Sequence, residues 1–288
     1  MKVIIIGAGA IGLTLAASLD PKNCLSVLVK EENYSDLKDR GLWIQKNNKK
    51  RRINARIITR LEEVELVIYA VKSYDMANAS GLIKDYKGKI IICQNGLKIL
   101  NYNFPNKNIV YSMVTSIGAE TISLGVSEFK GTGLTYIGNI NEKEPLPNNF
   151  TNLFSYEFFK VNSVQNIKDY IWGKAVINSA INPIATIYNL KNGDLIQDKY
   201  WNKVEELLLE SSNVAESEGI IFPNNPLESA RDIIEKTPTN MCSMLQDLKK
   251  GRRTEIEEIN GEICNIGRKN GVQIILNDFY RKKINALN

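Results

Sequence analysis

Three polar residues recur at four-residue spacing inside an apolar stretch in the second half of the chain. They are Lys174, Asn178 and Asn182, within residues 169–183. At about 100° per residue, this spacing puts them within roughly 80° of one another on one face of a helix. Burying such a stripe costs free energy unless it faces a polar cleft or a ligand. We therefore expect a ligand-facing stripe, against the alternative of a solvent-facing stripe on an amphipathic helix.

The chain contains no histidine. This excludes Ser-His and Cys-His nucleophile systems, histidine zinc sites and the histidine acid/base of many dehydrogenases. A lysine ammonium can instead donate a proton to a carbonyl oxygen, and a partly apolar cleft can lower its pKa toward the working pH. Lys174 is therefore the candidate proton donor, and Asn178 and Asn182 can orient a substrate through neutral hydrogen bonds.

A glycine-rich loop opens the chain. Residues 2–6, KVIII, have the continuous apolar pattern of a strand buried in a parallel sheet. Gly7, Gly9 and Gly12 follow, and residues 13–19 then continue at helical spacing. In this context the glycines permit a tight turn, the approach of a pyrophosphate to the backbone, and close packing of helix on strand. We interpret the loop as a dinucleotide phosphate site, with a purely structural turn as the alternative.

Candidate cofactor contacts follow the predicted strands of this half. Lys30 directly follows the strand at 25–29, at the position where a Rossmann domain distinguishes NADP from NAD. A lysine there suits the 2′-phosphate of NADP, whereas Glu31 suits the free hydroxyl of NAD. We favour NADP. Lys72 and Asn95 follow the strands at 66–71 and 89–93, and ligands bind outside the carboxyl ends of such strands. For these two residues, a purely structural role, as a capped strand end or a turn residue, is as good an explanation as cofactor binding.

These patterns predict an α/β fold with a doubly wound, mostly parallel Rossmann sheet at residues 1–165, followed by an all-helical domain at 166–288. Further elements are expected in the first domain: a hairpin at 41–58, a strand at 109–114, an antiparallel strand pair at 127–138 and a last strand near 158–161.

In the second domain, residues 240–247 are expected to form a helix end or a loop. Thr254-x-x-Glu257 has the form of a capping box, which would put Glu255 in the first turn of a helix that stops at Gly271. Taken alone, Glu255 is explained equally well as a favourable charge at a helix N-terminus.

Composition bounds the class of protein. The 288 residues suffice for two domains, and 43% hydrophobic with 24% charged residues is ordinary for a globular chain. The longest apolar runs are far below the roughly 20 residues that span a bilayer, and no secretory signal is recognisable, so we expect a cytoplasmic protein. Four cysteines show neither a CxxC pair nor metal-ligand spacing, so we expect structural thiols and no metal.

The net charge is modest, at +5, and the densest basic cluster is at residues 49–52. No aromatic residues interleave with it to stack on bases, which favours a solvated hairpin tip over a nucleic-acid contact. We expect a small-molecule partner, no nucleic acid and no membrane. The sequence leaves open whether the chain forms a homodimer.

Five segments together resemble ketopantoate reductases in order and spacing. They are GAGAIG at 7–12, AVKSYD at 70–75, QNG at 94–96, WGKAVINSAINPIATI at 172–187 and SMLQDLKKGRRTEIEEINGEI at 243–263. The last two are much more specific than the glycine motif, and the match extends over nearly the whole chain. The resemblance implies NADPH-dependent reduction of ketopantoate to pantoate in a cleft between a Rossmann and a helical domain, for pantothenate and coenzyme A biosynthesis.

The resemblance also assigns roles by position. Lys174 resembles the family's proton donor to the substrate C2 oxygen. The substrate-binding positions are matched by Lys174, Asn178, Asn182, Asn192 and Ser243. The cofactor contacts are matched by Gly7, Ala8, Gly9, Ala10, Ile11, Gly12, Lys30, Lys72, Asn95 and Ala119, and Glu255, grouped with them, resembles an acidic residue that helps to hold ligands.

Two residues depart from the family pattern: Ile117 stands where some members carry a histidine near the cofactor, and Ile275 where a proline is common. Neither is a catalytic position. Two other functions stay open. A reductase of another branched 2-keto acid would share these motifs and differ in pocket shape. A non-enzymatic nicotinamide-sensing protein would use the first domain without needing the Lys-Asn-Asn stripe.

Overall fold

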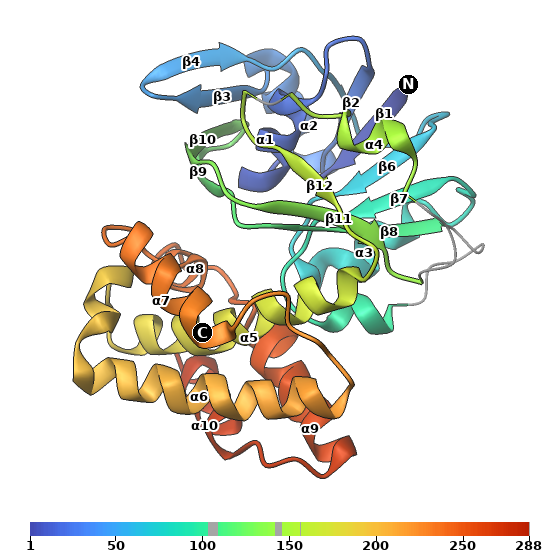
Figure 1. Cartoon of the computed structure of the whole chain (residues 1–288). Helices are drawn as coiled ribbons and strands as arrows, with labels where there is room; N and C mark the ends of the chain where they lie inside the picture. Colours follow the sequence, from blue (N-terminus) through green and yellow to red (C-terminus); the bar gives the residue numbers. More distant parts are fainter. Residues whose placement is uncertain (103–108, 142–145, 156, 288) are drawn as a thin grey trace. The chain divides into compact units, whose positions relative to one another are not determined.

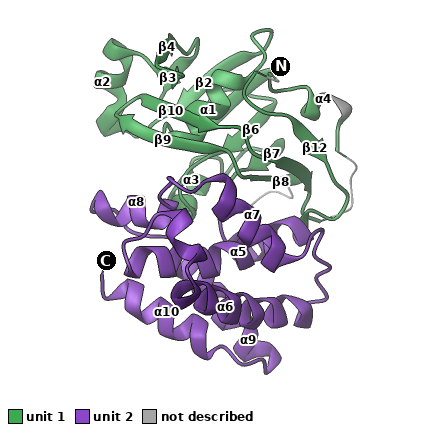
Figure 2. Ribbon diagram, turned by 60° about the vertical axis from the view of Figure 1, so that its left-hand side comes forward, with its two compact units in different colours: residues 1–94, 103–167 green, residues 95–102, 168–288 purple. Residues whose placement is uncertain are grey.

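The computed structural model describes residues 1–102, 109–141, 146–155 and 157–287 (Figure 1). It divides into two compact units, residues 1–94 with 103–167 and residues 95–102 with 168–288 (Figure 2). The sequence analysis placed residues 95–102 in the first domain. They pack instead with the helical unit, where the backbone N–H of Leu97 donates to the Glu258 carbonyl at 3.0 Å. In the part of the chain that the structure describes, no helix is long and apolar enough to cross a membrane.

The first unit is built on an eight-stranded sheet with the order β12-β11-β8-β7-β6-β1-β2-β5. The bounds are β1 (Lys2–Ile6), β2 (Cys24–Leu28), β5 (Arg56–Ile58), β6 (Leu66–Tyr69), β7 (Lys89–Ile92), β8 (Ile109–Thr115), β11 (Thr135–Asn139) and β12 (Val161–Ser163). The six strands from β8 to β5 are parallel, and β11 runs antiparallel to β8. This is the order of a doubly wound Rossmann sheet and confirms the predicted fold class.

Short helical segments accompany this sheet: α1 (Ala10–Ser18), α2 (Glu31–Arg40), η1 (Ser73–Asp75), α3 (Met76–Gly81) and α4 (Asn148–Thr151). Strands β1 and β6 are buried on both faces, since Ile4, Ile5 and Val67 are at most 3% exposed. A strand covered on both faces gains from an apolar side chain at every position, which explains why their sequences run without alternation.

The predicted hairpin is present but shorter than expected. Strands β3 (Trp43–Lys46) and β4 (Lys49–Arg52) pair antiparallel around Asn47 and Asn48, whose φ values are +50° and +61°. Asparagine tolerates this left-handed conformation, which tight hairpin turns require. The basic strand β4 is exposed throughout, as the hairpin prediction expected. Residues 56–58 leave the hairpin, because β5 pairs with β2 in the main sheet.

The predicted strand pair at 127–138 is wrong. Strand β10 (Val126–Gly131) lies in a small second sheet with β3 and β9 (Gly118–Ser123), whereas β11 pairs with β8 and β12 in the main sheet. The chain changes sheets at Gly133, where a Cβ would lie 2.3 Å from the Ser116 backbone. Alternation of residue types indicates which face of a strand is buried but not which strand lies beside it.

In the described residues of the second unit, every regular element is a helix or a helical turn. Its elements are η2 (Lys98–Asn101), α5 (Ile167–Ile187), η4 (Asn192–Ile196), α6 (Asp198–Ser217), α7 (Pro226–Lys236), α8 (Ser243–Lys249), η5 (Glu257–Gly261), α9 (Glu262–Asn270) and α10 (Ile275–Asn285). Helix α9 stops at Gly271 with a φ of +70°, as predicted.

Two local predictions in this unit are corrected. Residues 240–247 were expected to end a helix or form a loop, but α8 begins at Ser243 because the Cys242 sulfur accepts the Leu245 N–H at 3.5 Å. Glu255 lies just before the first helical residue, Ile256, rather than within the first turn.

Candidate functional site

The loop after β1 has the backbone geometry of a dinucleotide-binding turn. Gly7 has a φ of +110°, and at Gly12 a Cβ would lie 2.0 Å from the Gly7 carbonyl oxygen. Gly9 differs from both, because a Cβ built there meets no atom within 4 Å. Gly9 is also the N-cap of α1, and the N–H groups at a helix start favour an anion. The open backbone at Gly9 therefore fits a phosphate group, and half-buried Ala8, Ala10 and Ile11 line the same loop.

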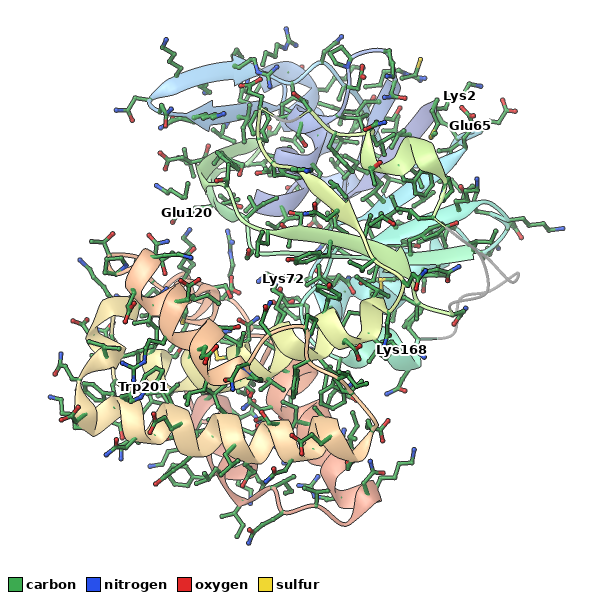
Figure 3. The ribbon with its side chains drawn as sticks, in the orientation of Figure 1. Lys2, Glu65, Lys72, Glu120, Lys168 and Trp201 are labelled. Atoms are coloured by element: carbon green, nitrogen blue, oxygen red, sulfur yellow. The ribbon has the colours of Figure 1, made fainter. Side chains whose placement is uncertain are left out.

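Two lysines of the first unit stand after parallel strands. Lys30 is exposed and directly precedes α2, whose first turn carries Glu31. Lys72, labelled in Figure 3, is half-buried between β6 and the turn η1. Nearby, the Gln94 amide donates to the Val71 carbonyl at 2.9 Å. This bond ties the ends of β6 and β7 together, so Gln94 has a structural role at the edge where Lys72 lies.

The small second sheet reaches the glycine loop. The Ser127 hydroxyl lies within hydrogen-bond distance of the Ala10 carbonyl, at 3.1 Å, and of the Glu120 carbonyl, at 3.2 Å. This places the backbone of β9, which also carries half-buried Ala119, beside the start of α1. Ile117, the departure from the family pattern, is 8% exposed and belongs to the apolar core.

Helix α5 carries the polar stripe. Lys174 and Asn178 are half-buried, and Asn182 is 4% exposed. Such burial does not match a helix face turned to bulk solvent, the alternative that the sequence left open. The backbone carbonyl of Asn182 accepts a hydrogen bond from the Cys242 thiol at 3.7 Å. This contact brings the end of the stripe next to the residue that precedes Ser243.

Ser243 and Asn192 lie in different surroundings. Ser243 is exposed at the first position of α8. Cys242, the residue before it, caps this helix, and burial raises the pKa of its thiol, so the cap is neutral. Asn192 is 7% exposed and donates from its side-chain nitrogen to the Thr237 hydroxyl at 2.8 Å. Its amide oxygen is buried without a hydrogen-bond partner among the described residues. The Asn192 side chain is thus anchored to the segment between α7 and α8.

Asn95 and Glu255 meet within the helical unit. The Asn95 side-chain nitrogen donates to the Glu255 carboxylate at 3.0 Å, and Glu255 is 5% exposed. The next residue, Gly96, has a φ of +85°, and a Cβ there would lie 2.3 Å from the Glu258 carbonyl oxygen. Only glycine lets the chain pass this close. The glycine of QNG therefore allows the approach that brings Asn95 to Glu255.

Glu258 was not predicted. Its side chain is 1% exposed; one carboxylate oxygen pairs with Arg253 at 3.0 Å, and the other is buried without a partner among the described residues. Burial raises the pKa of this carboxyl, an effect that the Arg253 charge opposes and the nearby Glu255 charge reinforces. No sequence pattern distinguished Glu258 from the exposed acidic residues of the same segment, since its burial results from packing against residues 95–98.

Comparisons with known proteins extend over the whole chain. The family model described as ketopantoate reductase PanE/ApbA matches residues 3–142, and its C-terminal counterpart matches residues 166–288. The 2-dehydropantoate 2-reductase of Pyrococcus abyssi is 30% identical, covering 96% of this chain and 94% of its own. A solved PanE/ApbA family ketopantoate reductase from Ralstonia eutropha JMP134 is 23% identical with a TM-score of 0.88, covering 100% and 98%. D-mandelate dehydrogenase solved with NADH is 25% identical with a TM-score of 0.85, covering 99% and 98%.

Proposed function

This chain belongs to the ketopantoate reductase family, and we propose that it reduces ketopantoate to pantoate with NADPH, for pantothenate and coenzyme A biosynthesis. The observation that carries the proposal is the stripe of Lys174, Asn178 and Asn182 on α5, largely withdrawn from solvent in a chain without histidine. A half-buried lysine accompanied by two amides on the same helix suits a small, anionic, carbonyl-containing substrate.

The first unit holds the cofactor in this proposal. The open backbone at Gly9 and the start of α1 would bind the pyrophosphate, and exposed Lys30 would bind the 2′-phosphate of NADPH. Lys72, Ala119 and Asn95 are the further cofactor contacts, with Glu255 helping to hold ligands. When bound, the nicotinamide supplies the hydride that reduces the ketone carbon.

The helical unit supplies the proton and the substrate contacts. Reduction of a ketone places negative charge on its oxygen, and a positioned cation stabilises that charge in the transition state. The Lys174 ammonium polarises the C2 oxygen and then donates its proton to it. Asn178 and Asn182 orient the substrate through neutral hydrogen bonds, and Asn192 and Ser243 complete its binding.

A second candidate function is the reduction of another 2-keto acid. The likeness to D-mandelate dehydrogenase supports this second candidate. That enzyme shares the fold over nearly the whole length of both chains, and its name gives a different 2-hydroxy acid. The motifs at 172–187 and 243–263 would serve either substrate, since both present a keto group next to a carboxylate.

Steady-state oxidation of NADPH against a panel of 2-keto acids tests the proposal. The panel contains ketopantoate, 2-ketoisovalerate, pyruvate and phenylglyoxylate. We expect the highest kcat/KM for ketopantoate, and a value about tenfold higher for another acid, roughly 1.4 kcal/mol of discrimination, would reassign the substrate. The same assay with NADH should give a lower kcat/KM than with NADPH. Lys30→Ala should reduce the ratio of the two kcat/KM values. Absence of turnover with every acid would favour a nicotinamide sensor.

A further inference from the structure

Pro183 directly follows Asn182, the last residue of the polar stripe, and removes one backbone hydrogen bond from α5. In an α-helix the carbonyl of residue i accepts the N–H of residue i+4, and proline has no N–H. The Ser179 carbonyl, four residues before Pro183, therefore lacks its helical donor. Ser179 is 0% exposed, so bulk water does not reach it to supply one. The missing bond would join residues 179 and 183, so the turn it would close begins just after Asn178 and contains Asn182.

Asn260 supplies the missing donor. Its side-chain nitrogen donates to the Ser179 carbonyl at 2.9 Å, although 81 residues separate the two. The same nitrogen donates its other hydrogen to the Asn277 amide oxygen at 2.9 Å, and Asn277 donates in turn to the Glu210 carboxylate at 2.9 Å. Asn260 is 0% exposed. The two bonds from one nitrogen fix the orientation of the Asn260 amide, with the nitrogen toward the Ser179 carbonyl.

The position of Asn260 in the chain connects two parts of the proposed site. It lies in the π-helical turn η5, which begins two residues after Glu255. Its hydrogen bond to Ser179 therefore joins the segment that carries Glu255 to the helix that carries the stripe. Turns of the π type interrupt regular helices and occur frequently at functional sites.

We propose that Asn260 is a positioning residue for the reduction. By replacing the N–H that Pro183 lacks, it sets the helical phase between Lys174 and Asn178, which precede the missing bond, and Asn182, which lies in the turn that this bond would close. The consequence for catalysis rests on the proposed function, whereas the hydrogen bond by which Asn260 replaces the missing donor of Pro183 does not.

Three variants test this pairing: Asn260→Ala, Pro183→Ala and the double variant. Pro183→Ala restores a backbone N–H at position 183, so the Ser179 carbonyl regains a donor within α5. We expect Asn260→Ala to lower kcat/KM for ketopantoate about 10–100-fold, as misplacement of a catalytic group does, with both kcat and KM affected. NADPH affinity, measured by fluorescence titration, should change little. The double variant should recover a large part of the lost kcat/KM and of the lost Tm, and Pro183→Ala alone should stay close to wild type.

Asn265→Ala, at an exposed asparagine on α9, is the matched control and should match wild type. A purely structural role would lower Tm while leaving kcat and KM of the folded fraction unchanged, and this outcome would overturn the proposal. A double variant no better than Asn260→Ala would overturn it as well. If Asn260→Ala alone does not fold, a folded and active double variant supports the proposal, and a second failure refutes it. An inactive wild type would refute the proposed function instead, while recovery of Tm in the double variant would still test the hydrogen bond.

Discussion

The side-chain amide of Asn95 donates a hydrogen bond to the Glu255 carboxylate at 3.0 Å, across 160 residues of sequence. The contact lies within the helical unit, because residues 95–102 belong to that unit although they follow a strand of the Rossmann sheet. A second hydrogen bond, from the Leu97 N–H to the Glu258 carbonyl, holds the same two segments of the chain together. Asn95, which follows β7, and Glu255, which precedes η5, are both candidate ligand contacts, and this hydrogen bond joins them directly.

A double-mutant cycle with Asn95→Ala and Glu255→Gln measures this contact. Hydrogen bonds to a charged group contribute about 1.5–3 kcal/mol, so we expect a coupling of at least about 1 kcal/mol in the free energy of unfolding. Chemical denaturation of the four proteins gives the value. Asn101→Ala, at an exposed asparagine of the same segment, serves as the control and should show no coupling to position 255. Additive effects of Asn95→Ala and Glu255→Gln would contradict the direct contact.

Lys174→Ala tests the proton donor. Loss of a positioned general acid should lower kcat by about 10²–10⁴, and Lys174→Arg should rescue poorly because a guanidinium hardly releases its proton. The rate of ketone reduction by the wild type should fall at alkaline pH, and this fall should vanish in Lys174→Ala. Steady-state kinetics across pH measure both effects.

Lys168, an exposed lysine near the start of the same helix and labelled in Figure 3, provides the control for that experiment. Lys168→Ala should retain the wild-type kcat and pH profile. A correctly folded Lys174→Ala protein that keeps more than about half of the wild-type kcat would exclude Lys174 as the general acid.

Gly9→Ala tests the phosphate position. The built Cβ contacts nothing and the φ of −84° suits any residue, so stability should change by only a few tenths of a kcal/mol. NADPH should bind about tenfold or more weakly, because the methyl group occupies the space assigned to the pyrophosphate. Thermal denaturation and calorimetric titration measure the two properties. Gly81→Ala, at an exposed glycine with equally open space, should leave NADPH binding unchanged, and equal binding by Gly9→Ala would exclude a phosphate contact there.

Glu258→Gln should make the protein more stable at neutral pH. Burial raises the pKa of Glu258, so the folded state binds this proton more tightly than the unfolded chain does. The ionised carboxyl therefore destabilises the fold above its folded-state pKa, and the penalty disappears as the pH falls through that value. We expect Glu258→Gln to have a higher free energy of unfolding than the wild type at pH 7 and to lose this advantage toward acidic pH.

Urea unfolding between mildly acidic and neutral pH measures that difference. Glu216→Gln, at an exposed glutamate on α6, should track the wild type at every pH. The Arg253 side chain is 56% exposed and remains solvated when its partner becomes neutral, so loss of the ion pair should cost little. A Glu258→Gln protein less stable than wild type at pH 7 would show that the ion pair outweighs the burial of the charge.

Properties confined to one element were readable from the sequence. The run KVIII predicted a strand buried on both faces, the spacing of Gly7, Gly9 and Gly12 predicted the turn into α1, and Gly271 predicted the end of α9. The four-residue spacing of Lys174, Asn178 and Asn182 predicted a shared face, and all three lie on α5. Each prediction held because backbone geometry within an element relates side chains a few residues apart, whatever surrounds the element.

Only the tertiary structure decided which elements meet. Alternation at 127–138 marked two strands but not that they belong to different sheets, and QNG did not indicate that Asn95 meets Glu255 in the helical unit. Pro183 leaves the Ser179 carbonyl without a donor inside α5, yet no feature of the neighbouring sequence identifies Asn260 as the group that supplies one. The physical reason is that a buried polar group must find a partner, while its partner's position depends on how distant segments pack.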